Sequence, residues 1–268
     1  MEMLSINNYN HVPWIIKFPD CKVELDHIQV HETWHNMFTL LFTDKQYSSI
    51  IKEELCKKLK LDQNTGIYPY PDLIFNAFRL TSFKKLKVII LGQDPYFDSE
   101  IHNDMIIPQA MGLSFSVPYG IKIPSSLRNI YANLKKYGHI ENTPTHGNLE
   151  SWSRRGCLLL NTSLTVKSGS SSKNCHQYIW RWFTDKIITY ISENKEKVIF
   201  VLWGNNALEK KDYIDATKHK LIISSHPSGL SAGKSLKEYP AFYNEDHFGK
   251  INKQLREWNI KEINWCIE

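Results

Sequence analysis

Short runs of apolar residues, each followed at once by polar or glycine-containing segments, recur along this 268-residue chain. Residues 88–91 are four aliphatic residues, too short a run for a helix and rich in β-branched side chains, which predicts a buried strand. Residues 157–160, 198–203 and 221–223 repeat this pattern. The chain is therefore expected to contain a core of four strands.

The segments between these strands have helical periodicity. Apolar residues recur at helical spacing in residues 47–61, 127–134, 179–191 and 206–213, and Ser125 and Ser126 are expected to cap the second of these helices, which Gly138 ends. Residues 98–109 are polar and aperiodic, which predicts a loop. Alternation of strands and helices predicts an α/β fold: a single domain with a central four-stranded parallel twisted sheet, flanked by helices on both faces in three layers.

A parallel sheet would gather the carboxyl ends of its strands at one edge. The polar residues that follow the strands, which should then share one crevice, are Gln93, Asp94, Tyr96, Asn161, Gly204 and His226. Asp94 alone could equally cap a helix. A carboxylate, a carboxamide and an imidazole at three strand ends instead favour a functional site.

Composition narrows the class of protein. Lys and Arg number 33 against 28 Asp and Glu, a net charge of +5 that is compatible with a polyanionic partner. The five cysteines form no CxxC pair, so we expect free thiols in a reducing compartment rather than a zinc ribbon or a zinc-dependent deaminase. Neither a signal peptide nor a membrane helix is recognisable, which predicts an intracellular protein, whether of nucleus, cytoplasm or a virus-infected host cell.

One metal-binding pattern requires an alternative hypothesis. His31, Glu32 and His35 match the H-E-x-x-H sequence of zinc metallohydrolases, and Glu53 or Glu54 could supply a third ligand. The longer metzincin pattern fails, because later positions lack the required Gly and His. A surface helix turn is the favoured interpretation, and the site prediction includes no metal.

Several motifs in order resemble those of the family 1 uracil-DNA glycosylases, over residues 68–265. They are Gly92-Gln93-Asp94-Pro95-Tyr96, residues 158–162, 183–185 and 202–204, and His226-Pro227-Ser228-Gly229-Leu230-Ser231. The resemblance implies an enzyme that flips uracil out of single- or double-stranded DNA and hydrolyses its N-glycosidic bond, leaving an abasic site for base excision repair. It implies no cofactor and no membrane, a monomer, uracil-containing DNA as partner, and a proteinaceous uracil-glycosylase inhibitor as a further partner to test.

The resemblance assigns the uracil pocket residue by residue. Phe115 matches the aromatic floor on which the base stacks, and Asn161 matches the amide that reads the O4 and N3–H edge of uracil. Tyr96 matches the ring that excludes the thymine methyl group, and Gln93 supports the pocket.

Catalysis and DNA contact are assigned in the same way. Asp94 matches the carboxylate that stabilises the sugar cation and activates water, and His226 matches the imidazole that hydrogen-bonds uracil O2. The remaining matches, which include an apolar wedge and loops for backbone phosphates, are Pro124, Ser125, Ser126, Gly204, Asn205, Ser228, Leu230 and Ser231. By this assignment residues 46–268 are the catalytic domain, and residues 1–45 are an extension anchored by Trp14 and Trp34.

The chain departs from the family pattern near the site. Phe97 replaces the usual His, Gly229 replaces Pro, and Asn205 replaces Ser. Residues 98–111 are longer than the family's connection, and residues 234–239 are a second insertion. A rival hypothesis is a catalytically weak glycosylase-fold subunit for DNA binding or processivity, but the matched catalytic positions are intact.

Overall fold

The computed structural model describes residues 2–25, 28–61, 66–169 and 176–267. Its central sheet contains β2 (Val88–Gly92), β5 (Cys157–Asn161), β7 (Ile199–Trp203) and β8 (Lys220–Ser224). All neighbours are parallel, in the order β5-β2-β7-β8. Every residue of the first three strands is buried, which is why these strands are continuous apolar runs in the sequence. The predicted parallel sheet is confirmed.

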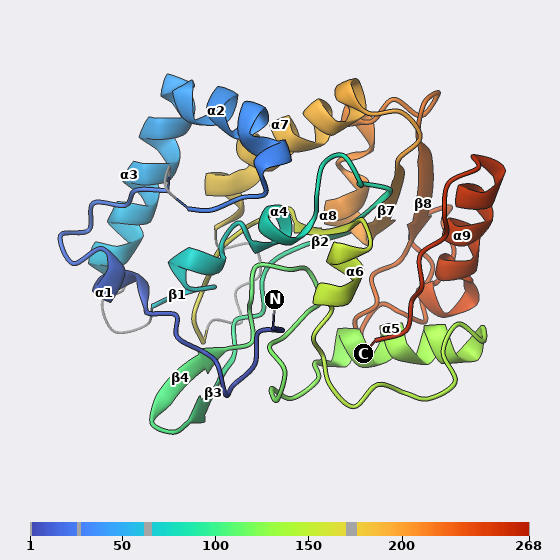
Figure 1. The fold of residues 1–268 in the computed structure, drawn as a ribbon, viewed down its shortest axis with the longest axis horizontal. Coiled ribbons are helices and arrows are strands. Elements are labelled where there is room, and N and C mark those ends of the chain that lie inside the picture. The colour runs from blue at the N-terminus through green and yellow to red at the C-terminus, as the bar shows by residue number, and fades with distance from the viewer. Residues whose placement is uncertain (1, 26–27, 62–65, 170–175, 268) are drawn as a thin grey trace.

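Helices cover the sheet on both sides. One group contains α2 (His35–Thr43), α3 (Lys45–Leu61) and α7 (Gln177–Asn194), and the other contains α5 (Ser125–Lys136), α6 (Glu150–Arg154) and α9 (His247–Glu257) (Figure 1). None of the helices in the described part of the chain has the length and apolar character needed to cross a membrane.

Two tryptophans attach the N-terminal segment to the rest of the chain, as predicted. Trp14, at the start of α1 (Trp14–Lys17), and Trp34, which ends a 3-10 turn (Glu32–Trp34), are almost fully buried. The indole N–H groups donate to the carbonyls of Pro69 and Thr81, each over 2.7 Å. The boundary between residues 45 and 46 remains a prediction.

The shorter elements complete the chain. β1 (Ile67–Tyr68) pairs antiparallel with β6 (Val166–Lys167), and α4 (Asn76–Leu80) precedes β2. The helix predicted for residues 206–213 is wrong in extent, because the chain forms a short α8 (Asn205–Leu208) and then a separate 3-10 turn (Lys211–Tyr213). A further 3-10 turn (Pro71–Leu73) lies before α4, and another (Phe242–Asn244) lies before α9.

Residues 98–109 form a β-hairpin, so the predicted loop is wrong. β3 (Ser99–His102) pairs antiparallel with β4 (Met105–Pro108) (Figure 1). Asn103 and Asp104 make the two-residue turn with φ of 48° and 61°, a left-handed conformation that Asn and Asp adopt more easily than most residues. Polar residues along the ribbon obscured its alternation in the sequence.

The zinc hypothesis fails on local geometry. His31 has extended backbone angles and caps the 3-10 turn, its Nδ1 accepting from the Thr33 amide at 3.3 Å, whereas His35 begins α2. The two imidazoles are therefore not one turn apart on a single helix. Glu54 instead accepts from Lys57. Within the described ranges, no group of three or more His, Cys, Asp or Glu side chains could hold a metal ion.

Candidate active site

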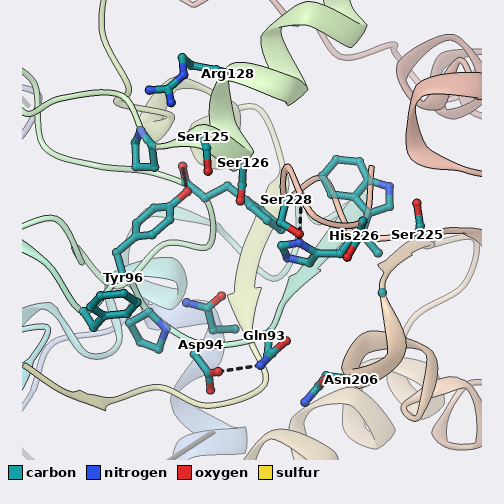
Figure 2. Close-up of a pocket in the computed structure, with 18 of the residues that line it drawn as sticks. Gln93, Asp94, Tyr96, Ser125, Ser126, Arg128, Asn206, Ser225, His226 and Ser228 are labelled. Atoms are coloured by element: carbon teal, nitrogen blue, oxygen red, sulfur yellow. Dashed lines mark hydrogen bonds between the residues drawn. The ribbon is translucent and has the colours of Figure 1, made fainter. Parts of the chain in front are cut away.

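A cleft of about 780 Å³ opens at the carboxyl edge of the sheet. All six residues predicted to share a crevice line this cleft, namely Gln93, Asp94, Tyr96, Asn161, Gly204 and His226. Figure 2 shows Gln93 and Asp94 on one side of the cleft, facing Ser125 and Ser126 on the other. The sheet edge therefore brings together side chains that are far apart in the sequence.

Asp94 is held by the loop that leaves β2. Its Oδ2 accepts from Gln93 Nε2 at 2.9 Å, and the carboxylate is half-buried (Figure 2). The Gln93 carbonyl accepts from Thr162 Oγ1 and from the Ser163 amide, both at 3.0 Å. These bonds tie the segments after β2 and β5 together, so the position of the carboxylate depends on both strands.

Asn161 lies beside Gly92 in the register of β5 and β2, and only 7% of its surface is exposed. A Cβ atom at Gly92 would lie 2.2 Å from Asn161 Oδ1 and 2.8 Å from Ser114 Cβ. A glycine is therefore required at this position for the amide to fit at the end of the strand. A buried amide offers both a donor and an acceptor to a ligand.

Phe115 and Tyr96 form the aromatic part of the cleft. Phe115 has φ of 63°, an unusual value for an aromatic residue, and its ring centroid lies 5.5 Å from that of Trp203 and 5.7 Å from that of His226. The Tyr96 hydroxyl donates to the Phe115 carbonyl at 3.3 Å. Burial raises the pKa of Tyr96, so this hydroxyl remains a neutral donor.

His226 follows β8 and accepts a hydrogen bond at Nδ1 from the Ser228 amide, at 3.0 Å (Figure 2). A neutral imidazole that accepts at Nδ1 carries its proton on Nε2, so it can act as a donor there. Gly204 has φ of 91°, and a Cβ on it would lie 2.9 Å from His226 Cβ. The glycine after β7 thus permits both the turn and the close approach of the imidazole.

The residues predicted to contact DNA lie on three loops around the cleft. Those that line it are Pro124, Ser125, Ser126, Gly204, Asn205, Ser228 and Ser231. Leu230 does not line it but protrudes beside it, with 75% of its surface exposed. One local prediction is wrong: Pro124 is the N-cap of α5, and Ser125 and Ser126 are its first helical residues with no side-chain cap.

Several residues that line the cleft were not predicted from the sequence. Lys122, Arg128, Asn206 and Ser225 contribute to the cleft (Figure 2 labels the last three). Arg128 follows Ser125 by three residues on α5, and this helical spacing could have revealed it. Lys122 lies in irregular backbone without a periodic pattern, so no comparable signal was present there, whereas Asn206 lies in the short helix α8.

The two insertions and Phe97 also reach the cleft. Asp98 and Gln109, at the base of the hairpin, line it. The second insertion contributes Lys234, Ser235 and Leu236. Phe97 packs against the hydrophobic core, and its carbonyl accepts from the Gly169 amide at 2.8 Å. An apolar ring therefore replaces the polar side chain that the family pattern has here.

The fold and cleft define an α/β protein with a ligand site at the carboxyl ends of its parallel strands. Residues 78–256 match the model of the uracil DNA glycosylase superfamily. A probable uracil-DNA glycosylase of Acanthamoeba polyphaga mimivirus is 38% identical over 99% of this chain and 72% of its own length. A uracil-DNA glycosylase of Helicobacter hepaticus is 42% identical over 91% of this chain and 98% of its own.

Solved structures agree with this relationship. The crystal structure of mimivirus uracil-DNA glycosylase superposes with a TM-score of 0.90 at 37% identity, covering 99% of this chain and 97% of that one. A mimivirus UNG variant in complex with UGI gives a TM-score of 0.91 at 38% identity, covering 99% of both chains. The chain belongs to the uracil DNA glycosylase superfamily.

Proposed function

We propose that this protein is a uracil-DNA glycosylase. It flips uracil out of single- or double-stranded DNA and hydrolyses the N-glycosidic bond, leaving an abasic site for base excision repair inside the cell. The main support for this function is that Asp94, Asn161 and His226 lie in one cleft, each near the end of a different parallel strand.

The cleft supplies what recognition of uracil requires. The flipped base stacks on Phe115, and the Asn161 amide donates to O4 and accepts from N3–H, a pattern that cytosine does not match. Tyr96, fixed by its bond to the Phe115 carbonyl, occupies the space that a thymine methyl would need. Gln93 completes this wall through its bond to Asp94.

Bond cleavage separates charge between the sugar and the base. The electron pair of the glycosidic bond moves to uracil N1, and a cation-like sugar develops at C1′. Asp94 stabilises that cation and accepts the proton of the water whose oxygen bonds to C1′. His226 donates from Nε2 to uracil O2 and stabilises the leaving anion. No cofactor takes part in these steps.

DNA binding uses the loops around the cleft. Backbone amides and hydroxyls of the segments at Ser125, Gly204 and Ser228 contact phosphates without reading sequence. The exposed Leu230 enters the duplex where the base leaves and offsets part of the unstacking cost. The alternative of a weakly catalytic DNA-binding subunit is disfavoured, because every matched catalytic residue lines the cleft.

A proteinaceous inhibitor is a second partner. The solved mimivirus UNG variants that superpose on this chain are complexes with UGI. We propose that an inhibitor of this kind competes with DNA for the cleft of this protein, which acts as a monomer. The DNA-contact loops would provide the competing surface.

The proposed function predicts metal-independent uracil release. In EDTA, the purified protein should release uracil from single- and double-stranded oligonucleotides and leave alkali-labile abasic sites. Gel analysis after alkali treatment measures this release, with a thymine-containing oligonucleotide of the same sequence as control. An intact uracil oligonucleotide under these conditions would refute the function.

Tyr96→Ala should extend the substrate range to thymine. Removal of the ring opens space for the C5 methyl, so thymine release should become measurable while uracil release falls. Chromatography of released bases checks both rates. Tyr178→Ala, which removes an exposed tyrosine of α7, is the matched control. If Tyr96→Ala remains wholly inactive on thymine, the steric role of this residue is wrong.

A further inference from the structure

The β3–β4 hairpin is firmly attached at the mouth of the cleft. Ile107 is fully buried, and the Tyr70 hydroxyl donates to the Ile106 carbonyl at 3.1 Å. The Gln109 amide donates to the Asp98 carbonyl at 3.0 Å and closes the base of the ribbon. The hairpin therefore offers a fixed surface to the segment packed against it.

That segment is the turn leading into α5, and it is held from two sides. Glu100 Oε1, on the hairpin, accepts from the Lys122 amide at 3.0 Å. Arg128 Nη1, on α5, donates to the carbonyl of the next residue, Ile123, at 2.5 Å. Two consecutive residues of the turn are thus tied to different elements, while the Lys122 side chain is exposed and lines the cleft.

The charge of the hairpin indicates which group meets a phosphate. Residues 98–109 include three carboxylates, at Asp98, Glu100 and Asp104, and no Lys or Arg. The hairpin itself would repel a DNA backbone, whereas Lys122 adds a cation at the same rim. When the backbone of a lysine is already ordered before binding, no further backbone entropy is lost when its side chain contacts a phosphate.

We infer that Lys122 is an additional contact for a DNA backbone phosphate and that Glu100 is the positioning residue that orients it. The inference rests on the proposed DNA substrate. It also gives the hairpin a role, because the ribbon supports the turn that contacts the phosphate.

The test measures binding to duplex DNA with a tetrahydrofuran abasic analogue, by fluorescence anisotropy between 50 and 200 mM salt. Lys122→Ala should weaken binding about fivefold at the lower salt and reduce the slope of log affinity against log salt by about 0.9. Glu100→Ala should weaken binding in the same direction, and Glu100→Gln, which keeps the acceptor oxygen, should restore it. The double variant Lys122→Ala/Glu100→Ala should bind no more weakly than Lys122→Ala alone.

Matched controls are Lys253→Ala on α9 and Glu193→Ala on α7, both exposed and outside the cleft. An unchanged salt slope in Lys122→Ala overturns the phosphate contact. Tighter binding by both Glu100 variants overturns the positioning role, because it would mean that the carboxylate merely repels DNA. If one of these binding predictions fails but the wild-type protein still releases uracil in EDTA, the proposed function is retained and only the role of Lys122 or Glu100 is rejected.

Discussion

Asp94→Asn is expected to lower the rate of uracil release about a thousandfold while DNA binding persists. The substitution keeps the shape of the side chain but removes the charge that stabilises the sugar cation and the base that accepts a proton from water. Asp94 is half-buried and hydrogen-bonded to Gln93, so water cannot easily replace the charge that the substitution removes. Single-turnover release from a uracil oligonucleotide gives the rate, and anisotropy with the abasic-analogue duplex gives the affinity.

Asp20→Asn is the matched control, because Asp20 is exposed on the N-terminal segment. Its rate should equal that of the wild type. If Asp94→Asn turned over at the wild-type rate, the carboxylate would have no part in the chemistry.

His226→Ala is expected to slow uracil release about a hundredfold to a thousandfold, again with DNA binding retained. The Ser228 amide bond to Nδ1 sets the tautomer and directs a donor from Nε2, and alanine supplies no donor. The loss should appear in the chemical step, so single-turnover kinetics separate it from product release.

His35→Ala provides the control and also tests the rejected zinc hypothesis. His35 is exposed at the start of α2. A glycosylase that uses His226 should be unaffected by this change and by EDTA. A large loss in His35→Ala together with normal turnover in His226→Ala would reverse the assignment of the two imidazoles.

The sheet and the centre of the site were predictable because both depend on local sequence. A parallel strand buried on both faces is a continuous apolar run, and the residue after it lies at the functional edge. Asn161 directly follows one apolar run, and Asp94 and His226 each lie within three residues of the end of another. Their convergence therefore needed only the general topology of α/β proteins and the family resemblance.

The β3–β4 hairpin and the turn that contains Lys122 depend on contacts between residues far apart in the sequence, which a local sequence pattern does not predict. The polar residues of 98–109 obscured the strand alternation, and the ribbon is stabilised by distant groups such as Tyr70. The Lys122 amide donates to Glu100, 22 residues away in the sequence. The H-E-x-x-H pattern failed for a related reason, because His31 caps a 3-10 turn instead of continuing into a helix.

Gly92 on β2 pairs with Asn161 on β5, so catalytic activity depends on the register between these two strands. A slip of one residue between β2 and β5 would reverse which face each side chain occupies and would move Asn161 away from Gly92, the position where an added Cβ would clash with its amide. Folded molecules with a shifted sheet would therefore keep their secondary structure but lose base recognition. Specific activity, compared with circular dichroism, thus measures the fraction of refolded chains that have assembled the correct sheet.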